Sequence, residues 1–440
     1  MRKLALHWQI LIAIVLAAIV GYIVNQAGDG DPTAPSFLGI PFLSVFQYIG
    51  TIFLNALKMI IVPLIMSSII VGMSGIGASG NLGALGGRTL LFYAVTTLAA
   101  IIVGLVLINF TQPGISDGQP VRDMMSLSGD VSEIAAAVGD RGVSDVAEVF
   151  LRLVPDNIVR AAVEGQMLGI IFFALLFGFF MTRIDKESGD LLDRFWQGVA
   201  GVMMGITDLI MKFAPLGVFG LVAKTVAGIG PEQLDDLAIS LGTFTLSVLL
   251  ALLVHVAVTL PVLLVLVARV NPLAHFKAMM PALLTAFSTA SSSATLPLTM
   301  ECVRDNAGVS NRTSSFVLPL GATVNMDGTA LYECVAAMFI AQAYGLELSF
   351  VTQFTIVLVA LLTSIGVAGI PAASLVAITI ILSSIGLPAE AIGLILAVDR
   401  ILDMFRTSVN VFSDSCGAVL IAKTEGEQDV LKAKPVRAVS

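Results

Sequence analysis

The sequence has 440 residues, of which 57% are hydrophobic and only 12% are charged. This balance excludes a soluble globular protein and predicts an all-α polytopic membrane protein. The net charge of -8 provides no basic surface for nucleic acid, so we expect no nucleic-acid partner.

The first apolar run lies within residues 1–24 and follows the basic residues Arg2 and Lys3. A cleaved signal peptide begins in the same way. This run is nearly 20 residues long and many others follow it, so we expect a retained first span. The basic residues before it predict a cytoplasmic N-terminus.

Further spans are expected at about 42–76, 89–110, 158–181, 199–227 and 239–270. Residues 112–147 are rich in Gly, Asp and Ser and should form a polar segment on the outer side. We expect a cytoplasmic loop at 182–194, which is basic, and an acidic connection at 230–236. Basic residues in the C-terminal tail then favour an even number of crossings, with both termini in the cytoplasm.

From residue 276 onward the pattern changes to an internal repeat. Small residues and proline interrupt two apolar segments, at 285–300 and 363–378, and each is followed by a long apolar span with polar residues at 325–329 or 403–410. A single break could be a loop between two short spans. Two breaks in corresponding positions instead predict a transporter site near the middle of the bilayer, where irregular backbone survives only if protein or a watery cavity surrounds it.

A polar stripe runs along the last span. Its members are spaced by four, three, four and four residues, so on a helix they share one face. A charge at the bilayer centre costs about 2.5 to 3.5 kcal/mol on insertion scales, so this face should point into the protein. The stripe predicts a binding site and consists of Asp399, Asp403, Arg406, Asn410 and Asp414.

The stripe suits a small zwitterion that carries an extra carboxylate. Arg406 offers a planar fork for one carboxylate, Asp403 can take an ammonium group, and Asn410 or Thr407 can hydrogen-bond the second carboxylate. A dicarboxylate without an amine would leave Asp403 without a cation, which favours an acidic amino acid over a succinate-like substrate. In the alternative interpretation, Asp403 and Arg406 merely satisfy each other. Groups at the two breaks could close over the ligand, namely Ser292 and the amides around Ile370.

Oxygen-bearing side chains in three segments suit a hard cation. Asn325, Asp327 and Asp414 supply carboxylate and amide oxygens without thiolate or imidazole, and the hydroxyls of Tyr93, Thr96 and Thr97 are ordinary helix polarity by themselves. On one helix, Asn325, Thr329 and Glu333 could share a face while Asp327 points elsewhere, and Gly328 would permit local unwinding.

Glu333 lies within the apolar sequence ALYECVAAMF. A buried carboxyl group without a cation is stable only in its neutral form, so Glu333 is a candidate proton carrier. It could equally be a neutral acid that is hydrogen-bonded within the bundle. His7, His255 and His275 are isolated in the sequence, so neither a metal cluster nor a catalytic triad is predicted.

Four stretches resemble the signature motifs of the glutamate transporter family, the dicarboxylate/amino acid:cation symporters: SSSATLP, PLGATVNMDGTALYE, SIGVAGIPAAS and DRILDMFRTSVNVFSD. The resemblance extends over nearly the whole chain and is strongest after residue 276. It implies a homotrimer whose subunits have eight transmembrane helices, two re-entrant helical hairpins, a scaffold domain and an elevator-type transport domain.

With that resemblance we divide the chain into four parts. Residues 1–75 hold the first two spans of the scaffold, and residues 76–190 hold spans three and four with the polar outer loop. Residues 191–270 hold spans five and six. Residues 271–440 hold the transport core, with both hairpins and spans seven and eight.

The resemblance also implies site residues. Asp403 would bind the substrate's amino group, Arg406 its side-chain carboxylate, and Asn410 and Thr407 its main-chain carboxylate. The implied substrate positions are Ser291, Ser292, Thr329, Ile370, Asp403, Arg406, Thr407 and Asn410. The implied sodium positions are Gly321, Asn325, Asn410 and Asp414 for one ion, Tyr93, Thr96, Thr97, Asn325 and Asp327 for a second, and Thr323, Ser364, Ile365 and Val367 for a third.

Family members usually carry a further arginine at one of two positions, and this chain has Ala290 and Met404 there. Arg400 is a candidate substitute. Glu333 matches the glutamate of proton-coupled members, which favours proton cotransport and a prokaryotic member of that kind.

The sequence therefore predicts a symporter of the inner membrane that imports glutamate or aspartate with sodium ions, protons or both, and that needs no cofactor beyond these coupling ions. Within the family, the alternative is a carrier of neutral amino acids or C4-dicarboxylates. An intramembrane hydrolase that uses a serine of 291–293 has no convincing base in the sequence, so we expect no enzyme. An ion channel is the remaining alternative.

Overall fold

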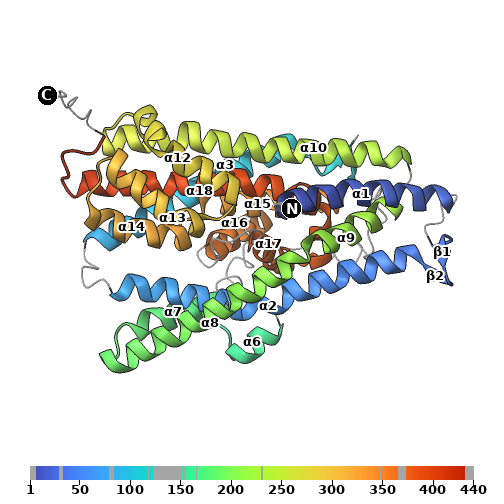
Figure 1. Ribbon diagram of the computed structural model, residues 1–440, viewed down its shortest axis with the longest axis horizontal. Coiled ribbons are helices and arrows are strands. Elements are labelled where there is room, and N and C mark those ends of the chain that lie inside the picture. The colour runs from blue at the N-terminus through green and yellow to red at the C-terminus, as the bar shows by residue number, and fades with distance from the viewer. Residues whose placement is uncertain are drawn as a thin grey trace, which may run out of the picture.

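The computed structural model describes residues 6–28, 33–78, 84–116, 118–121, 151, 154–164, 166–228, 231–346, 348–364 and 373–431. In this part of the chain nearly all residues lie in helices, most of which run along the long axis of the molecule (Figure 1). Helices satisfy every backbone polar group within one segment, which suits a chain with so few polar side chains.

The first helices are long and apolar on all sides. They are α1 (Leu6–Ala27), α2 (Phe42–Ala78) and α3 (Ala84–Thr111), and they confirm the first three expected spans. Two short antiparallel pairs follow α1 and α3: β1 (Ser36–Phe37) with β2 (Ile40–Pro41), and β3 (Ile115–Ser116) with β4 (Gln119–Pro120). The expected polar segment 112–147 lies outside the described residues after residue 121.

The fourth expected span is two helices, α6 (Ile158–Glu164) and α7 (Met167–Met181). Between them Gln166 has a non-helical backbone (φ -74°, ψ 72°), so the expectation of one uninterrupted helix at 158–181 is wrong. Its side chain donates a hydrogen bond to Glu164 Oε2 at 2.7 Å. Glu164 and Gln166 are exposed, and the apolar helix α7 begins directly after them.

The basic loop expected at 182–194 is wrong from residue 186 onward, because α8 (Lys186–Lys212) begins there. The Asp185 carboxylate accepts a hydrogen bond from the Ser188 amide and caps this helix. α9 (Ala214–Gly228) follows after a bend of 52°.

The acidic connection expected at 230–236 is likewise helical from Pro231, a residue suited to the first turn. α10 (Pro231–Val254) continues through the π-helical turn η2 (His255–Thr259), α11 (Leu260–Leu263) and a second π-helical turn, η3 (Leu264–Ala268).

The last third contains the predicted repeat. α12 (Pro272–Thr289) packs against α13 (Ser292–Glu301), and α16 (Phe350–Ser364) packs against α17 (Ala373–Ser384). The first break falls at Ala290, whose backbone is left-handed (φ 49°), and the tip of the second hairpin lies outside the described residues. The remaining elements are η4 (Cys302–Asn306), α14 (Asn311–Val324), α15 (Asp327–Ala343), η5 (Ala389–Leu394) and α18 (Leu396–Thr424).

Among the described residues, four helices are long and apolar enough to cross a membrane, and the bent pair α8 and α9 would make a fifth. α15 has only 17 residues, and α18 carries the charged stripe within its 29 residues. Length and apolarity therefore do not by themselves recover the eight expected crossings.

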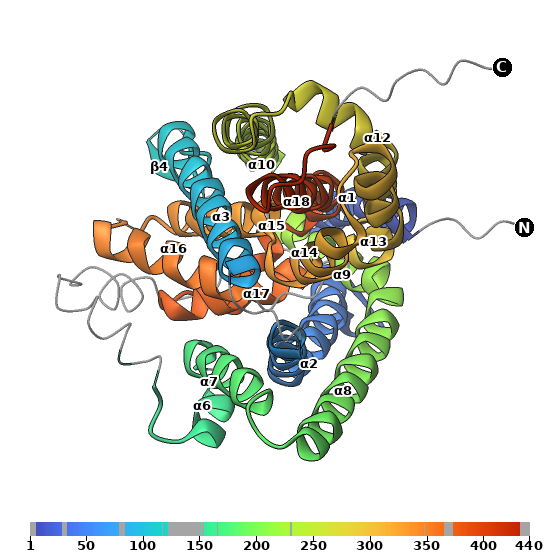
Figure 2. The same cartoon turned by 90° about the vertical axis from the view of Figure 1, so that its left-hand side faces the viewer.

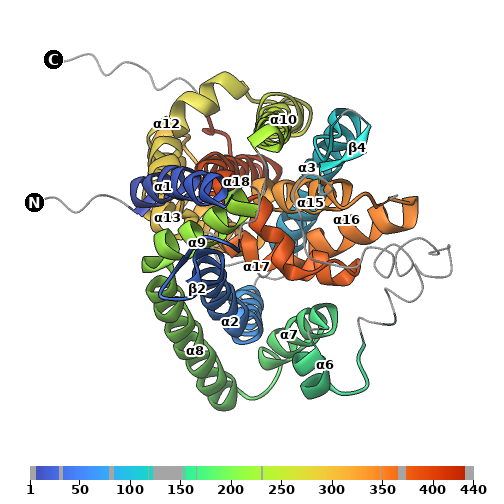
Figure 3. The same ribbon diagram turned by 90° about the vertical axis from the view of Figure 1, so that its right-hand side faces the viewer.

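Helix packing forms two groups. In one, α9 packs against α1 and α2, and α2 also packs against α7 and α8. In the other, α15 and α18 are surrounded by α3, α10 and the helices of both hairpins. The end-on views separate α2, α6, α7 and α8 from α3, α10, α12 and α18 (Figures 2 and 3). Every residue of α15 is buried, so the polar residues predicted to bind ligands lie in the centre of the second group.

Candidate functional site

The site is built around the chain break between α14 and α15. Asn325 and Met326 leave the helical conformation, with φ and ψ of -103° and 83° for the first and -112° and 58° for the second. Asn325 is therefore not on the same helix as Thr329 and Glu333, and the expectation that these three share a helical face is wrong. The unwinding precedes Gly328, which is already within α15.

Gly328 allows α15 to approach α18 closely. A Cβ atom at this position would lie 2.6 Å from the carbonyl oxygen of Arg406. The Gly328 amide donates a hydrogen bond to Asn410 Oδ1 at 2.8 Å, and Asn410 Nδ2 donates to the Thr329 hydroxyl at 2.9 Å. Two predicted substrate residues, Asn410 and Thr329, are therefore brought together.

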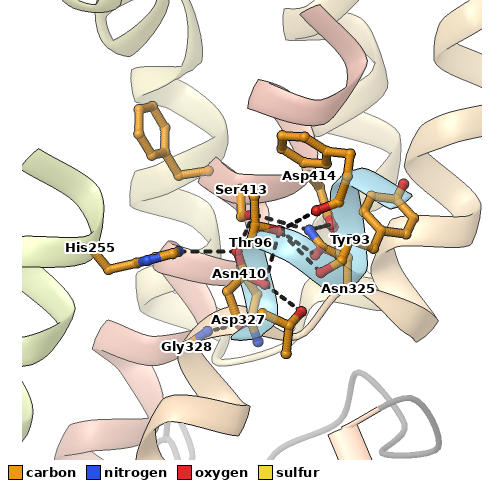
Figure 4. A network of polar contacts seen from close by, with 12 residues as sticks. Tyr93, Thr96, His255, Asn325, Asp327, Gly328, Asn410, Ser413 and Asp414 are labelled. Carbon is orange, nitrogen blue, oxygen red and sulfur yellow. Dashed lines mark hydrogen bonds and ion pairs between the residues drawn. The ribbon is translucent and has the colours of Figure 1, made fainter. Parts of the chain in front are cut away.

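Oxygen atoms from α3 and from the break form one cluster (Figure 4). Asp327 Oδ1 accepts a hydrogen bond from Thr97 at 2.6 Å, and the Thr96 hydroxyl lies 3.3 Å from both Asp327 Oδ1 and Asn325 Oδ1. The expectation that Asp327 points away from Asn325 is therefore wrong. Two residues of α3 that are predicted to bind a cation, Thr96 and Thr97, therefore contact the predicted residues at the break, Asn325 and Asp327.

A second acidic side chain, from α18, borders this cluster. Asp414 Oδ1 accepts a hydrogen bond from Asn325 Nδ2 at 2.9 Å. Gly321 leaves room for it, since a Cβ atom there would lie 2.7 Å from Asp414 Cγ and 2.9 Å from the Tyr93 hydroxyl. That hydroxyl donates to the Val317 carbonyl oxygen at 2.7 Å.

The cluster carries buried negative charge. Asp327 is 0% and Asp414 3% exposed. In the described part of the chain neither forms an ion pair with an arginine or a lysine. A buried carboxylate is stable only when a cation or a proton compensates it. The possible ligand atoms are carboxylate, amide and hydroxyl oxygens, which suit a hard cation better than a transition metal. Among the described residues, no group of three His, Cys, Asp or Glu side chains is arranged to hold a metal ion.

His255 is a functional candidate that the sequence did not reveal. Its Nε2 atom lies 3.0 Å from Asp327 Oδ2, and both side chains are fully buried. The same oxygen accepts a hydrogen bond from Ser413 at 2.6 Å. His255 is isolated in the sequence but contacts Asp327 in the fold. These residues are 72 and 86 positions from Asp327, so only the packing of η2 and α18 around α15 brings them together.

The charged stripe of α18 forms an ion-pair network. Arg406 Nη1 lies 3.0 Å from Asp399 Oδ1, and Arg406 Nε and Nη2 each lie 3.0 Å from Asp403 Oδ1. The guanidinium carbon is 4.2 Å from the centre of the Tyr332 ring. Arg400 Nη1 lies 3.1 Å from Asp403 Oδ2. Asp403 and Arg406 are thus paired with each other, as the alternative interpretation requires, but each also has a further ionic partner.

Three other predicted substrate residues lie at the start of α13 and on α18. Ser291 caps α13 by accepting a hydrogen bond from the Ala294 amide, and Ser292 is buried at the first residue of that helix, which packs against α18. Thr407 is buried beside Arg406. The helices on both sides of the first break therefore pack against α18, the helix that carries the charged stripe.

Glu333 lies on α15, one turn after Thr329. Its Oε2 atom accepts a hydrogen bond from the Thr363 hydroxyl of α16 at 3.0 Å. Oε1 is buried and has no hydrogen-bond partner among the described residues. The side chain is 0% exposed, so a negative charge on it would be poorly compensated.

The third predicted sodium position stays a prediction, because two of its four residues lie outside the described ranges. The hydroxyls of Thr323 and Ser364 donate only to backbone carbonyls of their own helices, at 3.0 Å to Leu320 and 2.9 Å to Leu361. The remaining predicted residues lie outside the described ranges, namely Ile365, Val367 and Ile370.

Comparison with known proteins gives matches along nearly the whole chain. The model of the sodium:dicarboxylate symporter family matches residues 6–424. The chain is 37% identical over 439 residues to the proton/sodium-glutamate symport protein of Geobacillus stearothermophilus, covering 99% of this chain and 98% of that protein. It is 36% identical over 436 residues to the proton/glutamate-aspartate symporter of Escherichia coli, covering 98% and 95%. It is also 37% identical over 446 residues to the neutral amino acid transporter B(0) of Bos taurus, covering 94% and 80%.

Proposed function

Because the chain belongs to the sodium:dicarboxylate symporter family, we propose that it imports an acidic amino acid, glutamate or aspartate, together with sodium ions, protons or both. The family consists of symporters, so this multi-pass membrane protein is a transporter and not an enzyme. The bacterial relatives named for proton, sodium and glutamate align over almost their full length.

The observation that carries the substrate assignment is the buried charge network of α18. Arg406, 1% exposed, offers the fork that grips a carboxylate, and Asp403, 6% exposed, offers the counter-charge for an ammonium. A neutral amino acid has no second carboxylate for Arg406. An acidic amino acid uses both charges, which supports it over the neutral substrate.

The coupling ions are assigned from the two kinds of buried acid. Asp327 and Asp414 lie among amide and hydroxyl oxygens and suit sodium. Glu333 has one hydroxyl partner in an apolar surrounding and suits a proton. We assign sodium binding to the cluster at the α14–α15 break and proton transfer to Glu333.

The architecture proposed with this function has eight membrane crossings, two re-entrant hairpins and cytoplasmic termini, in a homotrimer of the inner membrane. The group of α1, α2 and α7 to α9 would be the scaffold. The group around α15 and α18 would move as an elevator. The packing of helices into these two groups supports this division.

The test is uptake of labelled aspartate and glutamate into proteoliposomes, with sodium and proton gradients imposed separately. Arg406→Ala should weaken substrate affinity by at least about 30-fold, since loss of one member of a buried ionic contact costs roughly 2 kcal/mol or more. Glu333→Gln should preserve uptake but remove its dependence on the proton gradient. Matched controls are Arg304→Ala and Glu301→Gln, which change exposed residues outside the site and should behave as wild type.

Uptake that survives Arg406→Ala unchanged would contradict the assignment of the carboxylate site. Equal proton dependence in wild type and Glu333→Gln would contradict the proton-carrier role alone. No uptake of either amino acid under any gradient would refute the proposed function and direct the search to the neutral amino acids or to a channel.

A further inference from the structure

Asp403 is more fully paired than a free ammonium-binding group should be. Arg406 Nε and Nη2 hold Oδ1 at 3.0 Å, and Arg400 Nη1 holds Oδ2 at 3.1 Å. The side chains of Arg400 and Asp403 are 9% and 6% exposed. Of the two arginines only Arg400 contacts Oδ2, so a substrate ammonium that binds this oxygen competes with Arg400 for it.

The two arginines differ in how firmly they are held. Arg406 also pairs with Asp399 at 3.0 Å and lies over the ring of Tyr332. Within the described residues, Arg400 pairs with no acid other than Asp403. Each arginine has one buried nitrogen without a hydrogen-bond partner in this part of the chain, so the ion pairs distinguish the two. Displacing Arg406 breaks two ion pairs and a ring contact, whereas displacing Arg400 breaks one ion pair. An incoming ammonium should therefore displace Arg400.

We propose that Arg400 is a specificity-determining residue, an internal counter-charge for Asp403 that competes with the amino group of the substrate. The inference rests on the proposed function, since it takes Asp403 as the ammonium site. An acidic amino acid must break the Arg400–Asp403 pair when it binds. A dicarboxylate that lacks an amine leaves this pair intact and still finds Arg406 for its carboxylate.

The expectation that a ligand without an amine leaves Asp403 without a cation is wrong. The structure supplies that cation from one turn earlier on the same helix, at a spacing of three residues. The network also contains two acids and two arginines, so its formal charges cancel without a ligand. These residues are Asp399, Asp403, Arg400 and Arg406.

The experiment measures two quantities on the full-length protein in proteoliposomes: the half-saturating concentration of labelled aspartate, and the concentration of succinate that halves its uptake. Wild type is compared with Arg400→Gln, Arg400→Lys and the control Arg304→Gln, which removes an arginine from an exposed ion pair. The ratio of the two concentrations is taken within each variant, so a loss of active protein cancels.

In Arg400→Gln, aspartate should bind more tightly and succinate more weakly. The ratio should shift by about tenfold, the size of one partly buried ionic contact. Arg400→Lys keeps the charge and should lie near wild type, as should Arg304→Gln. A ratio that is equal in wild type and Arg400→Gln overturns the specificity role, while aspartate uptake in wild type leaves the proposed function standing. Absence of aspartate uptake in wild type overturns both.

Discussion

His255 provides the sharpest test of the cation cluster. Each carboxylate oxygen can accept about two hydrogen bonds. Asp327 Oδ2 accepts a hydrogen bond from Ser413 at 2.6 Å and lies 3.0 Å from His255 Nε2. These two groups hold the carboxylate so that Oδ1 faces the hydroxyls of Thr96 and Thr97. When a bound cation keeps this carboxylate ionised, it can only accept hydrogen bonds, so in that state His255 donates from Nε2. We expect that His255→Ala frees Oδ2 and lets the carboxylate rotate away from Thr96 and Thr97.

The magnitude follows from the bond that is lost. A hydrogen bond to a charged group contributes about 1.5 to 3 kcal/mol. If that loss falls on the sodium-bound state, the half-saturating sodium concentration rises between about tenfold and somewhat over a hundredfold, at 1.36 kcal/mol per decade. His255→Gln retains an N–H donor and should recover part of the affinity.

The assay is aspartate uptake at saturating aspartate across a series of sodium concentrations, with a parallel thermal-unfolding series. The control is His275→Ala, which removes an equally buried histidine whose Nε2 lies 2.9 Å from Ser415. This change should lower the unfolding temperature and leave the sodium dependence near wild type. A sodium half-saturation for His255→Ala within about twofold of wild type, a difference of roughly 0.4 kcal/mol, would refute the reasoning.

Two further changes test the close approach at the cluster and the end of α18. Gly321→Ala places a Cβ atom 2.7 Å from Asp414 Cγ and should raise the half-saturating sodium concentration about tenfold, since overpacking costs about 1 to 3 kcal/mol. The control is Gly87→Ala, whose Cβ atom meets nothing within 4 Å and should leave the sodium dependence unchanged. For Glu427, partial burial raises the pKa, but hydrogen bonds from the Ser310 hydroxyl and amide at 2.6 and 2.8 Å help to hold it below its ordinary value. The ionised Glu427 carboxylate therefore stabilises the fold above the ordinary glutamate pKa, and this stabilisation is lost as pH falls through the lowered pKa of the folded state. Glu427→Gln should reduce the unfolding temperature at pH 7, and the difference in unfolding temperature between the variant and wild type should disappear in acid. A difference that grows in acid would contradict this assignment.

Local sequence patterns predicted much of the helical content and the first hairpin break. Apolar segments long enough to cross a membrane predicted α1, α2 and α3. The small residues around Ala290 predicted the turn between α12 and α13. The predicted ends of the helices are wrong where a charged segment is expected to be a loop. The segments after Asp185 and after Gly230 are helical because a capping carboxylate or a proline at the first turn starts a helix even in polar sequence.

The binding stripe could be predicted because one helix carries it. Residues spaced by three and four positions must share a face of α18 whatever surrounds the helix, and their charge requires that this face be buried. Partners from other helices could not be predicted from spacing. Asn325 was assigned to the face of Thr329 because the two-residue break before α15 is not evident from the residue spacing.

By itself, the sequence determined that this chain is a helical membrane protein with one charged face and two broken segments. Composition and periodicity depend only on neighbouring residues, so folding cannot change them. The tertiary structure alone decided that His255 contacts Asp327, that Asn325 links the cluster to Asp414 of α18, and that Arg400 pairs with the second oxygen of Asp403. The physical reason is that hydrogen bonds and ion pairs depend on distances of about 3 Å, which packing sets between helices far apart in the chain.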